Sequence, residues 1–285
     1  MLAFIFIFVV VLGMYAVFVE PLLLLKVVRH KVVKSPEALG QKPLKVAVIT
    51  DLHACWPWMG PERITRIVTR VNELDADVVA LLGDYHTGMH SPFAKPLETA
   101  SAWAKPMSAL RAPLGVLGVL GNHDWLEGGE EAREALEANG VTVLENRALR
   151  VSTRGNSHVW FIGLGDQYGK AEQLHGSGRR DDLDAALSLV EEDAALRVLL
   201  AHEPDIFVKS KDHVDVTISG HTHGGQVRLP FIGALTIPSR LDLKYARGAF
   251  EENESTLIVG SGLGCSGLPI RFLCPPEVLL IEIYV

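Results

Sequence analysis

The chain has 285 residues, of which 48% are hydrophobic, and its formal net charge is −7. This length is enough for one large domain with a substantial core. The acidic balance argues against broad, charge-driven binding of nucleic acid. Three cysteines with no Cys-x-x-Cys pair do not make a disulfide framework, so the fold must be stabilised by its core.

The N-terminal segment is apolar and uncharged over residues 2–19. About 18 apolar residues suffice to span a bilayer as a helix. A basic run follows between residues 26 and 34, whereas a cleaved signal peptide carries its basic residues before the apolar core. We therefore predict an uncleaved membrane anchor within residues 1–34. The positive-inside rule places the basic flank, and the domain after it, in the cytoplasm.

Residues 35–43 read SPEALGQKP, a composition typical of a linker. From residue 44 onward, short apolar runs alternate with amphipathic stretches. Strands are predicted at 44–50, 78–82, 115–120, 159–163, 197–201, 216–219, 257–260 and 277–285. Helices are predicted after Gly60-Pro61, because proline suits the first helical position, and over 130–139, where Gly140 ends the helix. This alternation indicates an α/β domain over residues 44–285.

Polar residues follow five of these strands at the point where each strand ends. They are Asp51, Gly83-Asp84, Gly121-Asn122, His202 and Gly220-His221. Sites in open α/β sheets gather beyond the carboxyl ends of the strands, so we expect these side chains to converge. Each motif alone is common, but all five in this order predict a metal centre rather than polar turns, since buried charges need partners or a metal.

The donor set in these motifs consists of carboxylates, one carboxamide oxygen and imidazoles. This mixture suits Mn, Fe, Zn or Co better than a thiolate site would. Within the Asp-x-His and His-x-His pairs, an extended backbone would direct alternate side chains into one cavity. Glycines precede three of the ligands, where they let the chain turn sharply or pass close to the ions.

The motifs resemble those of the calcineurin-like metallophosphoesterase superfamily, over residues 44–285. The sequences GHTHGGQ at 220–226, GLPIRF at 267–272 and CPPE at 274–277 are similar, more narrowly, to a bacterial branch of membrane-associated or exported phosphodiesterases. The resemblance implies a four-layer αββα sandwich with two mixed β-sheets, preceded here by the anchor helix. It also implies two divalent metal ions, Mn²⁺ foremost, with Fe, Zn, Co or Mg as alternatives.

The resemblance also implies a ligand for each metal position. Three residues would hold the first metal: Asp51, His53 and His223. Three would hold the second: Asn122, His202 and His221. Asp84 would bridge the two ions. Two divalent ions about 3.5–4 Å apart can clamp a phosphate and generate a bridging hydroxide that attacks phosphorus.

Two further residues of the Gly-Asn-His-Asp motif are the predicted catalytic residues. The resemblance places His123 beside the substrate phosphate, which Asn122 would also contact. His123 would donate a proton to the leaving oxygen or stabilise charge on the phosphoryl group. Asp124 would orient His123 or cap the helix that follows.

We therefore predict a membrane-anchored, monomeric phosphodiesterase or pyrophosphatase at the bacterial inner membrane, acting on a phosphorylated small molecule or a lipid-linked substrate. Trp56-Pro57-Trp58-Met59 is predicted to form an apolar wall beside the site or ordinary packing against the next helix. The specific alternative is hydrolysis of UDP-2,3-diacylglucosamine in lipid A synthesis, which some superfamily members perform. Another alternative is that the enzyme is a phosphomonoesterase or a cyclic-nucleotide phosphodiesterase. A non-catalytic metal sensor or scaffold is the alternative of a different class, which His123 argues against, since metal binding does not need it.

Overall fold

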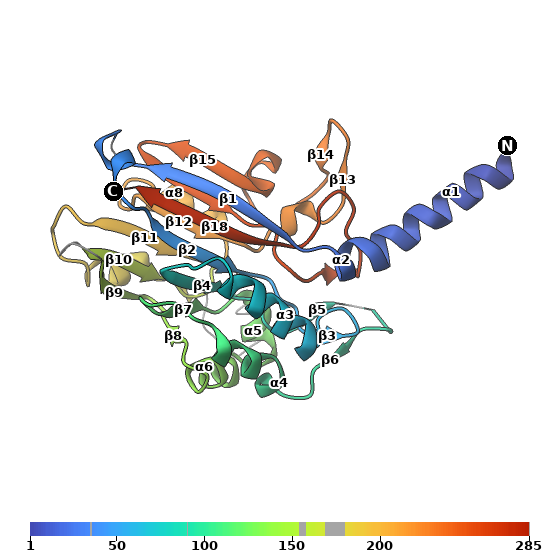
Figure 1. The fold of residues 1–285 in the computed structure, drawn as a ribbon, viewed down its shortest axis with the longest axis horizontal. Helices are drawn as coiled ribbons and strands as arrows, with labels where there is room; N and C mark the ends of the chain where they lie inside the picture. Colours follow the sequence, from blue (N-terminus) through green and yellow to red (C-terminus); the bar gives the residue numbers. More distant parts are fainter. Residues whose placement is uncertain (35, 90, 154–157, 169–179, 285) are drawn as a thin grey trace.

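The computed structural model describes the chain except residues 35, 90, 154–157, 169–179 and 285. Two six-stranded mixed sheets pack face to face, and helices cover the outer face of each sheet (Figure 1). The layers therefore run helices, sheet, sheet, helices, which confirms the predicted αββα sandwich. The apolar layer between the sheets includes Val46, Val48, Phe161 and Ile218, all fully buried.

The first sheet has the strand order β1-β18-β2-β4-β7-β8. Its strands are β1 (Lys26–Val33), β2 (Leu44–Ile49), β4 (Val78–Leu82), β7 (Val116–Val119), β8 (Thr142–Val143) and β18 (Glu277–Tyr284). Its outer face is covered by α3 (Pro61–Asn72), α4 (Ala100–Ala104) and α6 (Gly129–Glu137). β2, β4, β7 and β8 run parallel, so their carboxyl ends meet at one edge of the sheet.

The second sheet has the strand order β15-β16-β12-β11-β10-β9. Its strands are β9 (Arg147–Ser152), β10 (His158–Gly163), β11 (Leu196–Leu200), β12 (Val216–Ser219), β15 (Gly248–Glu252) and β16 (Ser255–Val259). The short helices α7 (Leu183–Leu187) and α8 (Phe207–Ser210) lie on its outer side. The four central strands are parallel, and β9 and β15 join them antiparallel at the edges.

Short elements build the loops around the carboxyl ends of the central strands. They are β3 (Cys55–Trp56) with β6 (Lys95–Pro96), β5 (Gly88–Met89) with β17 (Ser266–Gly267), the hairpin of β13 (Arg228–Leu229) and β14 (Gly233–Ala234), and the helix α5 (Asn122–Glu127). The β3–β6 and β5–β17 pairs each join loops that follow different central strands.

The folded domain begins before the boundary predicted at residue 44. Residues 26–33 form β1, which pairs with β18 in parallel along its whole length and buries Val32 between the sheets. The predicted anchor segment, residues 1–34, therefore extends too far, because residues 26–33 belong to the domain. The basic side chains of this segment suggested a membrane flank. In the structure Lys26, Arg29 and Lys31 are exposed on an edge strand, where charge blocks pairing with other chains.

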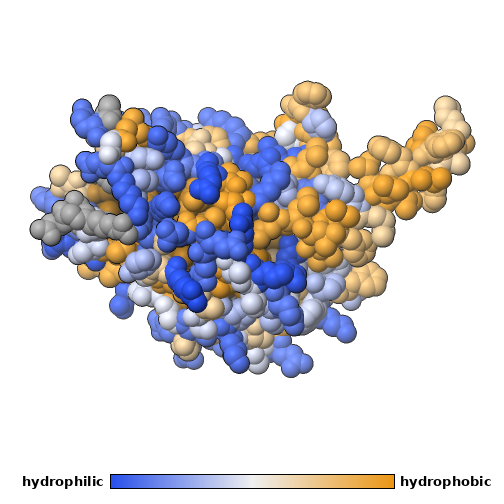
Figure 2. All heavy atoms as spheres, in the orientation of Figure 1, coloured by the Kyte–Doolittle hydropathy of each residue, from blue (hydrophilic) through white to orange (hydrophobic). Residues whose placement is uncertain are grey.

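An apolar helix precedes β1 and projects away from the domain (Figure 1). It comprises α1 (Leu2–Met14), a π-helical turn (Tyr15–Val19) and α2 (Glu20–Leu23). Within the described residues, Leu2–Leu23 is the one helix that is long and apolar enough to cross a membrane. Figure 2 shows its apolar surface as an exposed rod that continues onto the domain where the helix meets it.

The end of this helix is bound to the domain by hydrogen bonds. Pro21 has no N–H, so the carbonyl of Val17 loses its usual helical donor. The indole N–H of Trp58 donates to that carbonyl instead, at 3.1 Å. The buried carboxylate of Glu20 accepts the backbone N–H groups of residues 273–274. Trp58 therefore has the packing role that was one of its two predicted interpretations, but the helix that it packs against is the N-terminal one.

Candidate metal centre

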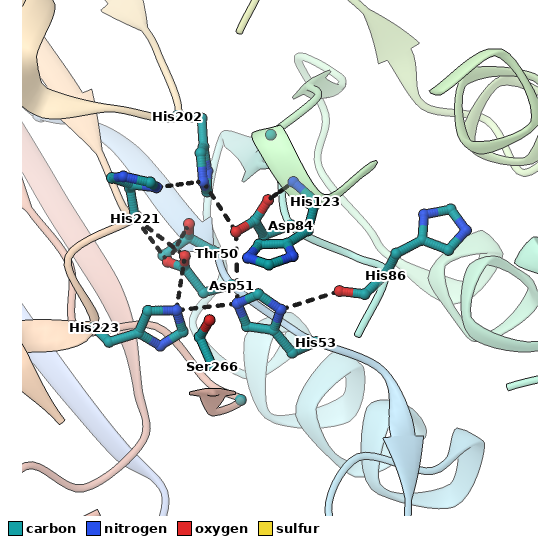
Figure 3. Close-up of polar contacts among 12 residues, drawn as sticks. Thr50, Asp51, His53, Asp84, His86, His123, His202, His221, His223 and Ser266 are labelled. Atoms are coloured by element: carbon teal, nitrogen blue, oxygen red, sulfur yellow. Dashed lines mark hydrogen bonds and ion pairs between the residues drawn. The ribbon is translucent and has the colours of Figure 1, made fainter. Parts of the chain in front are cut away.

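The structure brings six of the seven predicted ligands together at the carboxyl ends of strands from both sheets (Figure 3). The seventh, Asn122, begins α5 directly after β7. The ligands follow β2, β4, β7, β11 and β12 in the order Asp51 and His53, Asp84, Asn122, His202, then His221 and His223. Asp51, His53, Asp84 and His202 are almost completely inaccessible to solvent. The strand-end pattern therefore located a real cluster of side chains.

The backbone at these ligands is left-handed. The φ angles are 52° at Asp51, 45° at His53, 55° at Asp84, 68° at His221 and 51° at His223. Such conformations cost non-glycine residues about 1–3 kcal/mol each and persist where the surroundings fix them, typically at functional sites. An extended backbone was predicted for the Asp-x-His and His-x-His pairs. That geometry was wrong, although both members of each pair do face the cluster.

Two of the glycines that precede ligands are required by close approach. A Cβ on Gly121 would lie 2.4 Å from Oδ1 of Asp84. A Cβ on Gly220 would lie 2.0 Å from Oγ1 of Thr50 and 2.5 Å from Oδ2 of Asp51. Both distances are far below van der Waals contact, so the loops can interleave only because these positions lack a side chain.

The first group of candidate ligands consists of Asp51, His53 and His223, whose ligand atoms all lie within 4.8 Å of one another. Nε2 of His53 is 3.0 Å from Nε2 of His223, and the latter is 3.5 Å from Oδ1 of Asp51. Nδ1 of His53 bonds to the carbonyl of His86 at 3.0 Å. That bond places the proton on Nδ1 and leaves Nε2 with its lone pair toward the cluster.

The second group consists of Asp84, His202 and His221. Nε2 of His202 lies 3.2 Å from both Nδ1 of His221 and Oδ2 of Asp84. Nδ1 of His202 bonds to the carbonyl of Leu82 at 2.6 Å, which again leaves Nε2 as the ligating nitrogen. Oδ2 of Asp84 is also 3.5 Å from Nε2 of His53, so this carboxylate reaches both groups.

These residues fit divalent cations. Two ligands bound at about 2.1 Å to one ion, about 90° apart, are themselves about 3.0 Å apart, which matches the two imidazole pairs. Nitrogen lone pairs facing each other at 3.0 Å (His53 and His223) repel unless a proton or cation lies between them. Oδ1 of Asn122 is buried without a hydrogen-bond partner among the described residues. A carboxamide oxygen in that state is available to a metal.

Burial controls the protonation of two of the histidine ligands. It lowers the pKa of His53 to about 3 and that of His221 to about 4, so both are neutral, which is the ligating form. Burial also raises the pKa of Asp51 to about 6. Burial alone would raise the pKa of Asp84 as well, but the adjacent His202 and His53 outweigh it and hold that pKa well below its usual value.

His123 stands beside the ligand cluster without belonging to either group. Its backbone N–H donates to Oδ1 of Asp84 at 2.9 Å, and its half-buried ring lies edge-on to that of His53, with centroids 5.1 Å apart. Figure 3 shows the ring next to Asp84 and His53. His123 therefore adjoins both Asp84 and His53 while remaining outside the two ligand groups.

Asp124 is fully buried at the start of α5, and its bonds go mainly to the backbone. Its carboxylate accepts the N–H groups of residues 84–86 at 2.8–3.0 Å and that of Gly121 at 2.9 Å. It also lies 3.3 Å from Nδ1 of His86. The hydrogen bonds found among the described residues do not join it to the His123 ring. These contacts favour the helix-capping alternative for Asp124. Because its carboxylate also binds the backbone of the Asp84 loop, Asp124 is a positioning residue for that loop.

Two further residues contribute to the site without having been singled out in the sequence. A Cβ on Gly88 would lie 2.8 Å from the His123 ring and 2.9 Å from that of His53. The buried guanidinium of Arg271 lies 3.4 Å from Nδ1 of His223 and donates to backbone carbonyls around it. Arg271 falls within the GLPIRF segment noted above, but no role was given to it. Gly88 leaves no sequence signal, because its requirement arises from contacts between distant segments.

Comparison with known proteins decides the family. A model of the calcineurin-like phosphoesterase family matches residues 44–225. The chain belongs to this family. Members of this family are phosphoester hydrolases that use divalent metals, so the chain is a metal-dependent phosphoester hydrolase. The candidate ligand groups lie within residues 44–225, the segment that the family model matches, at the ends of its strands.

Relatives of this metallophosphoesterase match most of its length. The uncharacterized metallophosphoesterase YkuE of Bacillus subtilis (strain 168) is 29% identical over 94% of this chain and 88% of its own. An uncharacterized metallophosphoesterase of Aquifex aeolicus (strain VF5) is 30% identical over 84% and 85%. A transmembrane protein with metallophosphoesterase domain from Danio rerio is 29% identical over 86% of this chain, which spans 54% of that longer protein.

Proposed function

We propose that this metallophosphoesterase is a membrane-anchored phosphodiesterase or pyrophosphatase with a dinuclear metal centre. The observation that carries the proposal is the reach of one carboxylate. Oδ2 of Asp84 is 3.5 Å from Nε2 of His53, in the first ligand group, and 3.2 Å from Nε2 of His202, in the second. A shared carboxylate sets the spacing that a two-metal site needs.

The chemistry follows from the ligand assignment. Asp51, His53 and His223 would hold one ion and Asn122, His202 and His221 the other, with Mn²⁺ the first ion to test. When bound, such a pair supplies charge that stabilises the phosphoryl group and lowers the pKa of water. His123 contributes a proton to the leaving oxygen or a hydrogen bond to the phosphoryl group, because its ring borders the cluster without being needed for ligation.

The N-terminal helix supports attachment to a bilayer. The whole helix is about 33 Å long, of which the unburied α1, with 13 residues, makes up about 20 Å and the rest is bound to the domain. Glu20 binds the helix to residues 273–274, and the same loop carries Arg271, which contacts His223. The candidate centre is thus held near the membrane, which supports a lipid-linked substrate. Although they lie in β1, the side chains of Lys26, Arg29 and Lys31 are exposed within about ten residues of the helix, so the positive-inside rule still supports a cytoplasmic domain at the inner membrane.

The test uses the full-length chain, purified in detergent, with bis-p-nitrophenyl phosphate and Mn²⁺. We expect turnover and two bound Mn²⁺ per chain by mass spectrometry of metal content. Asp84→Asn is the matched control, and it should lose turnover together with bound metal. Bound ions without turnover under any divalent metal would refute the hydrolase and favour the sensor alternative.

The substrate is identified by a comparison of active and Asp84→Asn protein on membrane lipid extracts. Mass spectrometry should show one lipid-linked phosphodiester or pyrophosphate consumed by the active chain alone. Consumption of UDP-2,3-diacylglucosamine would establish the specific alternative. If only soluble phosphoesters were cleaved, the lipid-linked part of the proposal would fail while the hydrolase part would stand.

A further inference from the structure

The hairpin of β13 and β14 carries an unusually exposed apolar tip. Its turn is Pro230-Phe231-Ile232, in which the exposed fractions of Phe231 and Ile232 are 109% and 70%. Phe231 adopts a φ of 65°, a left-handed conformation that is unfavourable for a bulky residue. A strained aromatic side chain held fully in solvent stabilises nothing in the isolated domain, so its partner must lie outside the domain.

The root of this hairpin is joined to the root of the N-terminal helix through one residue, Phe272. The N–H of Arg228, in β13, donates to the carbonyl of Phe272 at 2.9 Å, and the ring of Phe272 packs edge-on against Tyr15, with centroids 6.4 Å apart. The hairpin and α1 project from the same end of the domain (Figure 1), and both carry apolar surface there (Figure 2). The tip and the helix are therefore two separate apolar projections at one end of the domain.

The segment around the hairpin is basic, although the chain as a whole is acidic. Residues 226–247 contain four basic side chains against one acidic, a net charge of +3, whereas the chain carries −7. The basic residues are Arg228, Arg240, Lys244 and Arg247. Arg240 and Lys244 are exposed, whereas Arg228 and Arg247 bond to groups of the domain. An exposed apolar tip in a basic segment has the composition of elements that bind the surface of an anionic bilayer.

We propose that the β13–β14 hairpin inserts its tip into the headgroup region of the anionic bilayer that α1 enters. This inference rests on the membrane anchorage proposed above. The hairpin follows the candidate ligand His223 closely, and Nη1 of Arg228 donates to the carbonyl of Gly224 at 2.8 Å. Seating the tip would therefore fix the height and tilt of the metal centre above the lipid, which a single helix cannot do.

The experiment places an environment-sensitive fluorophore on the full-length chain in vesicles of phosphatidylethanolamine and phosphatidylglycerol. The three native cysteines are buried, so an introduced cysteine is labelled selectively. Phe231→Cys and Ile232→Cys report on the tip, and Val9→Cys reports on α1. Val208→Cys, an equally apolar and exposed site on α8, is the matched control on another part of the surface.

We expect labels at positions 231 and 232 to be quenched by nitroxides near the headgroup end of the acyl chains, as for an element about 5–10 Å deep, and to be shielded from aqueous iodide. The label at Val208 should be quenched by aqueous iodide and not by the lipid nitroxides. If the label at Val9 is quenched while both tip labels stay open to iodide, the hairpin proposal is wrong and the anchorage stands. If none is quenched, both are wrong. Shielding without lipid quenching would also refute the proposal and point to a protein partner at the tip.

Discussion

Asp124 fixes the backbone that presents Asp84. Oδ2 of Asp124 accepts the N–H of Asp84 at 2.8 Å, and Oδ1 accepts the N–H of Tyr85 at 2.8 Å. Both acceptor and donors are buried. Asp124, the neighbour of the predicted general acid His123, therefore acts on Asp84, the predicted bridging ligand forty positions earlier in the chain. It holds the Asp84 loop in a left-handed conformation.

Asp124→Asn should destabilise the domain and weaken metal binding together. In the asparagine variant an N–H₂ group replaces one carboxylate oxygen, and that oxygen now accepts hydrogen bonds from two buried backbone N–H groups. Each buried donor left without an acceptor lowers the free energy of unfolding by about 1–3 kcal/mol. We expect the free energy of unfolding, from urea titration followed by circular dichroism, to fall by about 2–3 kcal/mol. The control is Asp184→Asn on exposed α7, which should change it by about 0.5 kcal/mol or less. Unchanged stability in Asp124→Asn would show that these hydrogen bonds do not hold the loop.

His123→Ala should separate catalysis from metal binding. Its imidazole belongs to neither ligand group, so the variant should bind as much Mn²⁺ as the wild type and unfold at the same urea concentration. The p-nitrophenolate leaving group of bis-p-nitrophenyl phosphate needs little protonation, so we expect the loss of a hydrogen bond to the phosphoryl group to lower turnover by about 10²–10³-fold. Turnover of bis-p-nitrophenyl phosphate and metal content are measured on the same preparation. Together they show whether His123 acts in turnover or in metal binding. A variant that lost metal in proportion to activity would mean that His123 is a ligand.

The sequence was informative about the site because parallel strands end at one edge of a sheet. Each apolar run with a polar residue after it specifies a position at that edge, so the convergence of Asp51, Asp84 and His202 could be predicted without coordinates. The left-handed backbone at those ligands could not, because it is imposed by loops packing against one another. The role of Asp124 was open for the same reason, since its partners come from another loop.

The N-terminal boundary was misplaced for a different physical reason. A strand that alternates basic and valine residues at a sheet edge has the same composition as the basic flank of a membrane anchor, so β1 could not be distinguished from such a flank. The hydrogen bond between Glu20 and Cys274, which are 254 residues apart, likewise has no local signature. Contacts between distant segments decided both features.

Gly88→Ala should reduce activity without unfolding the domain. The added methyl group would lie 2.8–2.9 Å from the rings of His123 and His53, so one ring must shift by a few tenths of an ångström or more. Displacements on this scale can cost about a hundredfold in turnover. Gly40→Ala is the matched control, because a Cβ there meets nothing within 4 Å. Equal turnover of the two variants would show that the His123 ring needs no such tight placement.

Metal binding should strengthen as the pH rises. Burial raises the pKa of Asp51 to about 6, so below that pH a proton competes with the cation for this carboxylate. Burial would lower the pKa of His202, but Asp84 outweighs it and raises that pKa well above its usual value, so this imidazole must also release a proton to bind a metal. His53 and His221, with pKa values of about 3 and 4, are already neutral and add nothing in this range.

The sign of the effect follows from which form binds. A cation takes the deprotonated carboxylate and the neutral imidazole, so affinity for Mn²⁺ should rise about tenfold per pH unit for each ligand group that is still protonated. The contribution of Asp51 should fade above about pH 6, and that of His202 should persist to higher pH. Calorimetric titration in two buffers of different ionisation enthalpy measures both the affinity and the protons released. We expect at least one proton released per chain at about pH 6. Affinity that stayed constant from about pH 5 to about pH 8 would mean that Asp51 and His202 are not ligands.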